Sequence, residues 1–248
     1  MIRLLKRLPP VQRWLVRKYF WKSFNETGEY ELKELERYVP KDRVAIDVGG
    51  NIGIYAFHLG RLAKEVIVFE PNPLYVERLR KAGLAQHLEQ VALSDKEGVA
   101  ELRIPYRDGQ EDHGMASLES EAVPGSVLAR AIQVPIRRLD DFAYKNVGFI
   151  KIDVEGHEEG VLKGALETVR RERPALLIEI EERHNPGGLQ RIRDLLTGYD
   201  GFFFLHGERK PLAEFDQARH QREEDLKIAM KNRRESAYVN NFLFVPAA

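Results

Sequence analysis

The 248-residue chain contains no cysteine. A disulfide scaffold, a thiolate zinc site and a cysteine nucleophile are therefore all excluded. The chain also lacks any apolar run near the ~20 residues that a membrane-spanning helix needs. Its first residues lack the uninterrupted apolar core of a secretory signal. We therefore expect a soluble, cytoplasmic protein.

An excess of either charge is missing as well, because 39 Lys and Arg balance 39 Asp and Glu. Domains that bind nucleic acid usually carry a clear basic excess, so no nucleic-acid partner is expected. RNA methylation that uses the basic N-terminus is kept as a less favoured alternative. With 43% hydrophobic residues, the chain has enough apolar material for a sizeable core. Its length fits one α/β domain with insertions.

Residues 1–25 are an exception to this charge balance. They contain Lys and Arg but no Asp or Glu, and the first acid of the chain is Glu26. Aromatic and aliphatic side chains alternate with these basic residues. We expect an N-terminal helical arm over residues 1–40 and a single domain over 41–248. The arm is interpreted either as a helix on an anionic membrane surface or as a helix packed on the domain. Pro9-Pro10 interrupts the helical run and favours the packed helix.

Strands and helices alternate along the rest of the chain, which is typical of a parallel α/β sheet. Strands are expected at Val44–Val48, Glu65–Glu70, Gln90–Leu93, Phe149–Asp153, Ala175–Glu181, Gly201–Leu205 and Asn241–Val245. Helices are expected at Ile54–Ala63, Leu74–Ala82, Glu159–Arg171 and 189–197. Two insertions interrupt the pattern. One is an irregular hairpin with loops near 101–130, and the other is a mixed-charge, solvated helical segment near 206–235 that would suit a lid.

A glycine turn follows the first strand and opens the first helix. Its residues Gly49, Gly50, Asn51 and Gly53 are expected to bind a cofactor, because glycines let a ligand approach the first helical amides. A dinucleotide site requires G-x-G-x-x-G, but valine occupies the first glycine position here. Asp47 would repel a pyrophosphate, whereas it would attract the ammonium group of S-adenosyl-L-methionine.

Two further acids follow strand ends and point to a nucleoside. Glu70 ends the second strand, where a carboxylate accepts hydrogen bonds from both ribose hydroxyls of NAD or S-adenosyl-L-methionine. Asp95 follows the third strand and is placed to meet the exocyclic amine of an adenine. The same residue also fits a simple turn, because Ser94–Gly98 is rich in turn-forming residues. Buried acids at 47 and 70 are costly unless a partner satisfies them.

Six motifs together resemble the FkbM family of methyltransferases, in the family's own order. They are Asp47-Val-Gly-Gly-Asn-Ile-Gly53, Phe69-Glu-Pro-Asn-Pro73, Ala92-Leu-Ser-Asp95, Arg138-Leu-Asp-Asp141, Ile150-Lys-Ile-Asp-Val-Glu-Gly156 and Val161-Leu-Lys-Gly-Ala165. The resemblance implies a Rossmann-like class I methyltransferase fold with a seven-stranded, mostly parallel sheet. It also implies S-adenosyl-L-methionine as cofactor and O-methylation of a hydroxyl on a sugar, glycoconjugate or natural product. By the same resemblance, Asp112–Leu118 would contact the cofactor or the acceptor.

Methyl transfer to a hydroxyl needs a general base, or a metal that acidifies the hydroxyl. Asp153, Glu155 and His157 follow a strand at the sheet edge where ligands bind. We expect Asp153 and Glu155 to line the catalytic pocket, one of them orienting or deprotonating the acceptor. His157 is the alternative base, since an unperturbed histidine pKa lies near ~6.5. A divalent metal is not favoured, and no metal ligand is assigned.

The acids after the next strand, Glu179 and Glu181, have a simpler interpretation as partners of nearby arginines. Two alternative functions stay open. An NAD-dependent oxidoreductase is disfavoured by Val48 and Asp47. A non-catalytic nucleotide-binding protein is disfavoured by the acids at 153 and 155. The expected partner is a small-molecule or glycan acceptor with a free hydroxyl, and the oligomeric state is left open.

Overall fold

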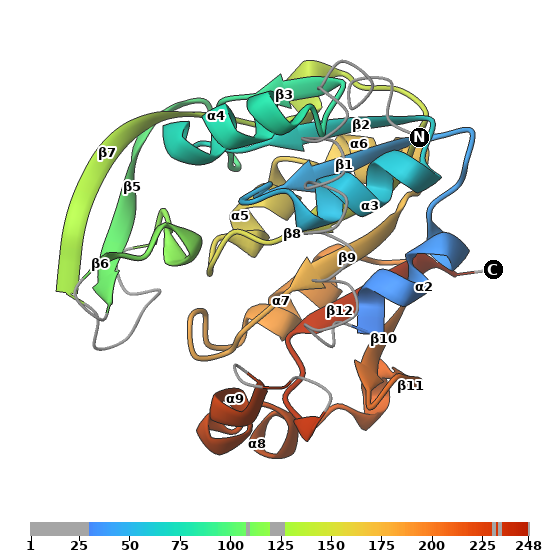
Figure 1. Ribbon diagram of the computed structural model, residues 1–248. Helices are drawn as coiled ribbons and strands as arrows, with labels where there is room; N and C mark the ends of the chain where they lie inside the picture. Colours follow the sequence, from blue (N-terminus) through green and yellow to red (C-terminus); the bar gives the residue numbers. More distant parts are fainter. Residues whose placement is uncertain (1–29, 108–109, 120–126, 230–231, 233–234, 248) are drawn as a thin grey trace, which may run out of the picture.

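The apolar run Val44–Val48 forms β1, and in the computed structural model this strand lies inside an eight-stranded sheet. The structure describes residues 30–107, 110–119, 127–229, 232 and 235–247. The sheet order is β11-β10-β12-β9-β8-β1-β2-β3. β3, β2, β1, β8 and β9 run parallel, while β12 is antiparallel to both β9 and β10. Helices flank this sheet on both faces (Figure 1), so the Rossmann-like α/β prediction is confirmed.

The strands of both sheets are β1 Val44–Val48, β2 Glu65–Phe69, β3 His87–Glu89, β4 Ala92–Leu93, β5 Gly98–Arg107, β6 Gln110–Glu111, β7 Val127–Arg137, β8 Val147–Ile152, β9 Ala175–Glu179, β10 Tyr199–Leu205, β11 Glu208–Pro211 and β12 Asn241–Pro246. The α-helices are α2 Tyr30–Tyr38, α3 Ile54–Leu62, α4 Pro73–Ala82, α5 Glu158–Lys163, α6 Leu166–Glu172, α7 Gly188–Leu195, α8 Gln217–His220 and α9 Glu223–Ala229. Short 3-10 turns are η2 His113–Met115, η3 Leu139–Phe142 and η4 Leu212–Glu214.

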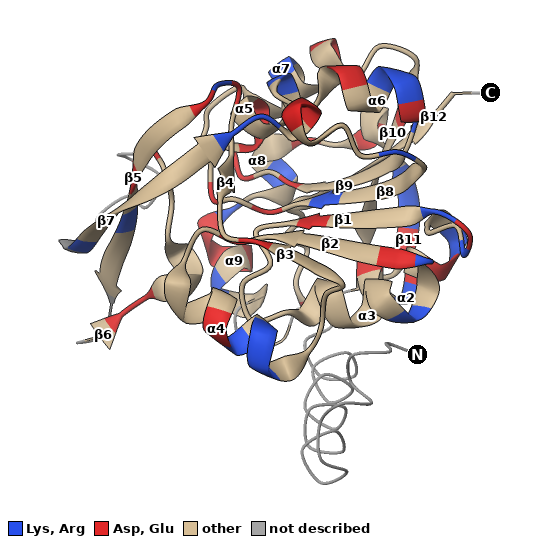
Figure 2. Ribbon diagram, turned by 90° about the horizontal axis from the view of Figure 1, so that it is seen from above, with Lys and Arg blue, Asp and Glu red and all other residues tan. Residues whose placement is uncertain are grey.

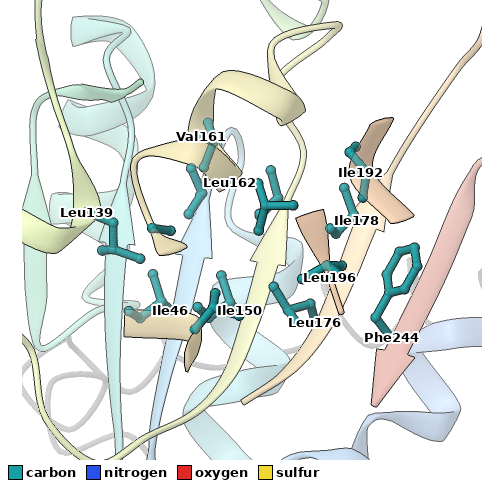
Figure 3. Packing of buried hydrophobic residues seen from close by; sticks show 14 of the residues in the cluster. Ile46, Leu139, Ile150, Val161, Leu162, Leu176, Ile178, Ile192, Leu196 and Phe244 are labelled. Atoms are coloured by element: carbon teal, nitrogen blue, oxygen red, sulfur yellow. The ribbon is translucent and has the colours of Figure 1, made fainter. Parts of the chain in front are cut away.

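Side-chain alternation along β1 explains the two-sided core. Ala45 faces one cluster together with Leu35 of α2, while Ile46 and Val48 face the other. Figure 3 shows the second cluster, where Ile46 and Ile150 of neighbouring strands lie beneath helical side chains such as Val161. The parallel strands are buried on both faces, which is why their sequences are continuously apolar.

The main sheet has one strand more than the seven expected, because β11 forms a hairpin with β10. His206 and Gly207 both have positive φ angles, 50° and 83°, and so form the kind of tight turn that returns the chain antiparallel. The expectation of a solvated helical insertion over 206–235 is therefore wrong at its start. The rest of the segment contains the short helices α8 and α9, and most of its described residues are exposed, although Leu212 and His220 are buried.

A second sheet of four strands, in the order β4-β7-β5-β6, stands beside the carboxyl ends of the main sheet (Figure 1). The prediction that Gln90–Leu93 is the third strand of the main sheet is wrong. His87–Glu89 takes that place beside β2, while Ala92–Leu93 pairs with β7 in the second sheet. The stretch near 101–130 is correspondingly more regular than expected, because β5 and β7 pair over most of their length.

Three sequence motifs meet where the second sheet joins the helices. The expected helix Glu159–Arg171 is split into α5 and α6 at Gly164, whose missing Cβ would lie 1.9 Å from the carbonyl oxygen of Ser94. The amide of Asp140 donates to the carbonyl of Gly164 at 3.0 Å. Asp140 in turn accepts from the first amides of α6, including that of Thr168 at 2.8 Å. This contact fixes α5 and α6 against the second sheet.

The N-terminal arm is described only from Tyr30 onward, so the predictions for residues 1–25 lie outside the described residues. α2 packs Leu32 and Leu35 against the sheet face that α3 also covers. Among the helices that the structure describes, none is long and apolar enough to cross a membrane. Acidic and basic residues are interspersed along helices such as α4 and α6 (Figure 2), which matches the balanced composition.

Candidate active site

A cleft opens at the carboxyl ends of β1, β2 and β8. It consists of a cavity of about 180 Å³ beside Asp47 and a cavity of about 60 Å³ beside Glu70. The two cavities share Gly49, Asn51 and Asp153 in their walls and are therefore parts of one cleft. Its position is the place where open α/β sheets bind ligands.

The glycine turn after β1 is held tightly against the protein. Gly49 has a φ of +84°, and a Cβ there would lie 1.8 Å from the carbonyl oxygen of Asp153. At Gly53, with φ +93°, a Cβ would lie 2.4 Å from Leu84. The glycines therefore serve backbone conformation and packing. They bring the turn onto the loop after β8, which forms the other wall of the cleft.

Glu70 organises the turn from the end of β2. Its carboxylate accepts the amide of Asn51 at 2.7 Å and the amide of Asn72 at 2.8 Å. Burial raises the pKa of Glu70 to about 7, although these two amides act in the opposite direction. Asn72 caps α4 by accepting the amide of Leu74 at 3.1 Å. One buried carboxylate thus connects the glycine turn to the start of α4.

Asp47 is 1% exposed, and its Oδ2 has no hydrogen-bond partner. Burial raises its pKa to about 7. Asp153 and Glu70 add to this rise, and Lys151 opposes it. Lys151 is itself 1% exposed and lies beside Asp47 in the β1–β8 register. Its Nζ lies 3.6 Å from Asp153 Oδ2 and 4.9 Å from the ring centroid of Tyr55. The sequence alone predicted no role for Lys151 or Tyr55. The partners of a lysine in a buried strand come from other strands and helices, and the neighbouring sequence does not identify them.

The smaller cavity has an apolar wall built by both sheets. Phe69, Pro71, Leu93, Leu102 and Leu118 contribute to it. Residues of the segment 112–118 line this cavity, and His113 Nδ1 lies 3.0 Å from Asn72 Nδ2. Asp95 is exposed in the turn after β4, where Ser94 Oγ donates to its Oδ1 at 3.2 Å, and it is not among the residues that line the cavity.

Glu155 lines the same cavity in a strained backbone conformation, with φ +52° for a non-glycine residue. Ser117 Oγ donates to its carbonyl oxygen at 2.5 Å and holds it there. Burial raises the pKa of Glu155 well above its ordinary value, and the charges of Asp153, Glu181 and Glu158 raise it further. Asp153 and Glu155 therefore both line this cavity.

His157 borders the cavity but has both ring nitrogens engaged. Nδ1 lies 2.7 Å from Glu119 Oε1, and Nε2 lies 3.0 Å from Ser94 Oγ. The hydrogen bond from His157 lowers the pKa of Glu119. His157 thus ties the start of α5 to the second sheet and to the segment before residue 120. Nothing in the sequence pairs residue 119 with residue 157, so this contact was not foreseen.

A buried polar network continues from Glu155 toward β9 and β12. His184 Nδ1 lies 3.4 Å from Glu155 Oε2. Glu181 accepts from Tyr238 OH at 3.0 Å and from Arg183 Nε, as expected for a strand-end acid beside an arginine. Although burial opposes it, the Arg183 charge holds the pKa of Glu181 below its ordinary value.

Asn240 reaches the same network from the residue before β12. Its Nδ2 donates to Glu179 Oε1 at 2.6 Å and to Glu181 Oε1 at 3.2 Å. Within the described part of the chain, no three His, Asp or Glu side chains gather with the geometry of a metal site.

Comparison with known proteins gives a consistent picture. The methyltransferase FkbM domain family matches residues 47–206. Methyltransferase 1 of Beauveria bassiana is 27% identical over 154 residues, which cover 50% of this chain and 59% of that protein. The hexuronic acid methyltransferase AglP of Haloferax volcanii is 28% identical over 184 residues, covering 69% of this chain and 70% of that protein.

A solved structure shares the fold. The FkbM methyltransferase of Methylobacillus flagellatus superposes with a TM-score of 0.54 at 16% identity, over 97% of this chain and 56% of that one. The chain thus spans less than two thirds of this structure and of the Beauveria relative.

Proposed function

Because the chain belongs to the FkbM family of methyltransferases, we propose that it transfers the methyl group of S-adenosyl-L-methionine to a hydroxyl of a small-molecule or glycan acceptor. Residues 41–248 would form the catalytic domain. The observation that carries the choice of cofactor is the buried Asp47 Oδ2, which has no hydrogen-bond partner and borders the cleft. An ammonium group is the natural partner for such an oxygen.

The rest of the cleft fits the same cofactor. Glu70 would accept the ribose hydroxyls with the lone pairs that its two amide donors leave over. The apolar wall that includes Phe69 and Leu93 would cover the adenine. The turn residues Gly49, Gly50 and Asn51 would form the wall beside the cofactor's ammonium group, since they line the cleft next to Asp47. A dinucleotide fits less well, because its pyrophosphate would meet the carboxylate of Asp47.

When bound, S-adenosyl-L-methionine supplies an electrophilic methyl group. The chain must then orient a hydroxyl behind that methyl and remove its proton. Glu155 suits the proton transfer, since a buried carboxyl with a raised pKa is a stronger base than an exposed one. Asp153 would orient the acceptor, held in place by Lys151, whose Nζ lies 3.6 Å from its Oδ2. His157 is less suited to act as the base, because both its nitrogens already contact side chains.

A sugar is the favoured acceptor class within this proposal. The Haloferax relative is named for a hexuronic acid, and it is 28% identical to this chain. The polar side chains around Glu155 suit a hydroxyl-rich ligand better than an apolar one.

Isothermal titration calorimetry of the purified protein tests the proposal. S-adenosyl-L-methionine and S-adenosylhomocysteine should bind with micromolar affinity, with or without magnesium, and NAD should not. Asp47→Ala and Glu70→Ala should each weaken binding by about 1–3 kcal/mol through lost charged hydrogen bonds. The exposed Asp200→Ala, on β10, serves as the matched control. Binding of NAD alone would overturn the proposal in favour of an oxidoreductase.

A further inference from the structure

The segment 112–118, which contains η2, forms one wall of the smaller cavity of the cofactor cleft. We call this segment the strap. Its residues His113, Gly114, Ala116 and Leu118 all line the cavity. The strap is partly exposed along its length except at the buried Ser117, so its other side is in contact with solvent. It therefore separates this part of the cleft from the solvent.

Both ends of the strap are held by the second sheet. The amide of Asp112 donates to the carbonyl of Pro105 at 2.8 Å. Ser117 and Arg103 exchange two backbone hydrogen bonds, at 2.8 and 3.0 Å. Ser117 Oγ also donates to the carbonyl oxygen of Glu155. The turn η2 lies between these two anchored ends.

His113 joins η2 to the start of α4. Its Nδ1 lies 3.0 Å from Nδ2 of Asn72, and its Nε2 lies 3.0 Å from Oε2 of Glu111. Because Asn72 Oδ1 accepts the amide of Leu74, the group that Asn72 presents to the ring is its amide nitrogen, which is a donor. His113 Nδ1 must then accept, and the proton of the neutral ring is on Nε2, which donates to Glu111. Each nitrogen of the neutral imidazole thus has a partner of the right kind.

The closed strap leaves little room for a nucleoside. The cavity that it lines has a volume of about 60 Å³, whereas pockets for small ligands usually have volumes of about 300 Å³ or more. Glu70, to which we assign the ribose, lines this same cavity. Part of the wall must therefore move before adenosine can enter. The 3-10 turn η2 belongs to neither sheet, so it can move without breaking a strand pairing.

We propose that His113 holds the strap closed over the cofactor cavity, and that its hydrogen bond to Asn72 breaks before the nucleoside of the cofactor enters. His113 is in this sense a positioning residue, because it acts through the strap and not on the reacting atoms. The inference rests on the proposed S-adenosyl-L-methionine site and adds how access to that site is controlled. Closing loops control ligand exchange in many enzymes.

Loss of this hydrogen bond should raise the rate at which the cofactor associates. A protein that binds its ligand only in an open form associates in proportion to the fraction of molecules that are open. A neutral hydrogen bond contributes enough stability that its loss should raise the open fraction, and with it the association rate constant, by about 3- to 10-fold. A residue that only contacted the bound cofactor would change the dissociation rate instead.

Surface plasmon resonance on the immobilised full chain, with S-adenosylhomocysteine as the analyte, measures both rates. His113→Leu and His113→Asn form a matched pair, because the two new side chains have nearly the same size. The amide oxygen of the asparagine can take the place of Nδ1 and accept from Asn72, whereas leucine has no acceptor. Association should be about 3- to 10-fold faster than in the wild type for His113→Leu, and within about two-fold of it for His113→Asn.

Two further variants complete the test. Asn72→Ser keeps a side-chain acceptor for the cap of α4 but removes the donor to His113, so it should accelerate association as His113→Leu does. It breaks the same hydrogen bond from the other side, and it replaces His113→Leu if thermal unfolding shows that variant to be misfolded. His87→Leu, at an exposed position at the start of β3, is the control and should leave both rates unchanged.

Each result supports or overturns the inference. Association that is no faster in His113→Leu or Asn72→Ser, or a change in the dissociation rate alone, would overturn control of entry by His113. Equal acceleration in His113→Leu and His113→Asn would overturn it as well, because packing and not the acceptor at position 113 would then hold the strap. These results leave the proposed function standing. Failure of the wild type to bind S-adenosylhomocysteine would instead overturn the proposed function, and this inference with it.

Discussion

Asp47→Asn is expected to stabilise the cofactor-free protein above pH 7 while weakening its hold on the cofactor. The substitution keeps the size of the side chain and removes its charge. Burial raises the pKa of Asp47 from 3.8 to about 7, which corresponds to a cost of about 4 kcal/mol for keeping the carboxylate ionised. Lys151, Asp153 and Glu70 share in that shift, so we expect a gain of about 2–4 kcal/mol in the free energy of unfolding.

The stability gained by Asp47→Asn depends on pH, because burial destabilises the ionised form of Asp47. A carboxyl whose pKa is raised on folding stabilises the folded protein fully below its pKa in the unfolded chain, here 3.8. This stabilisation is lost as the pH rises through the folded-state pKa of about 7. The wild type should therefore lose stability between about pH 4 and pH 7, and Asp47→Asn should lose less. Urea unfolding at pH 5 and pH 8 measures the difference. Asp200→Asn, at an exposed position, is the control and should show none.

Calorimetry on the same variant measures its affinity for the cofactor product. S-adenosylhomocysteine keeps the ammonium group, so its affinity for Asp47→Asn at pH 8 should fall by about 1.5–3 kcal/mol. Such a fall is about 10- to 150-fold in Kd. An equal stability difference at pH 5 and pH 8 would refute the electrostatic reasoning, because a packing effect does not titrate. Unchanged affinity would show that Asp47 does not bind the ammonium group of the cofactor.

Three further outcomes are expected. Gly49→Ala should destabilise the protein by more than about 3 kcal/mol in urea unfolding, because its Cβ would lie 1.8 Å from the Asp153 carbonyl at a positive φ; a fully stable variant would contradict the described turn. Glu155→Gln should bind S-adenosylhomocysteine like the wild type but lower turnover by about 10²-fold or more in a radiolabelled methyl-transfer assay, and unchanged turnover would remove Glu155 from the mechanism. Tyr238→Phe should cost about 1–2 kcal/mol of stability because it removes the buried hydrogen bond to Glu181, and a neutral result would show that solvent replaces it.

The sequence predicted the part of the molecule whose signals are local. The apolar run of β1, the glycines after it and the acid at position 70 are adjacent in sequence to the backbone that they shape. Spacing along the chain was therefore sufficient to place Asp47 and Glu70 at the same sheet edge. Predicted and observed ends agree where a glycine follows the element, as at Val48 of β1 and Ala82 of α4.

Features that depend on contacts between residues far apart in the sequence could not be predicted from local patterns. The run Val91–Leu93 is apolar enough for a core strand, but hydrophobic periodicity does not say which sheet the strand joins, and β4 joined the second sheet. The burial of Lys151 beside Asp153 is likewise a property of three neighbouring strands. The contact between Glu119 and His157 spans 38 residues, and no short motif encodes it.

The junction of Ser94, Asp140 and Gly164 limits how this fold can be altered. Motifs that are separated by up to seventy residues form one contact, in which a carbonyl occupies the space of a missing Cβ. A side chain at 164 would push β4 away from α5, and β4 is one of the strands that carry the long β5–β7 hairpin. Exchanging that hairpin with a relative's would therefore succeed only as a graft that carries its own partners for positions 94 and 164. The β5–β7 pair and the α5–α6 break therefore form one structural unit, in which neither can be changed alone.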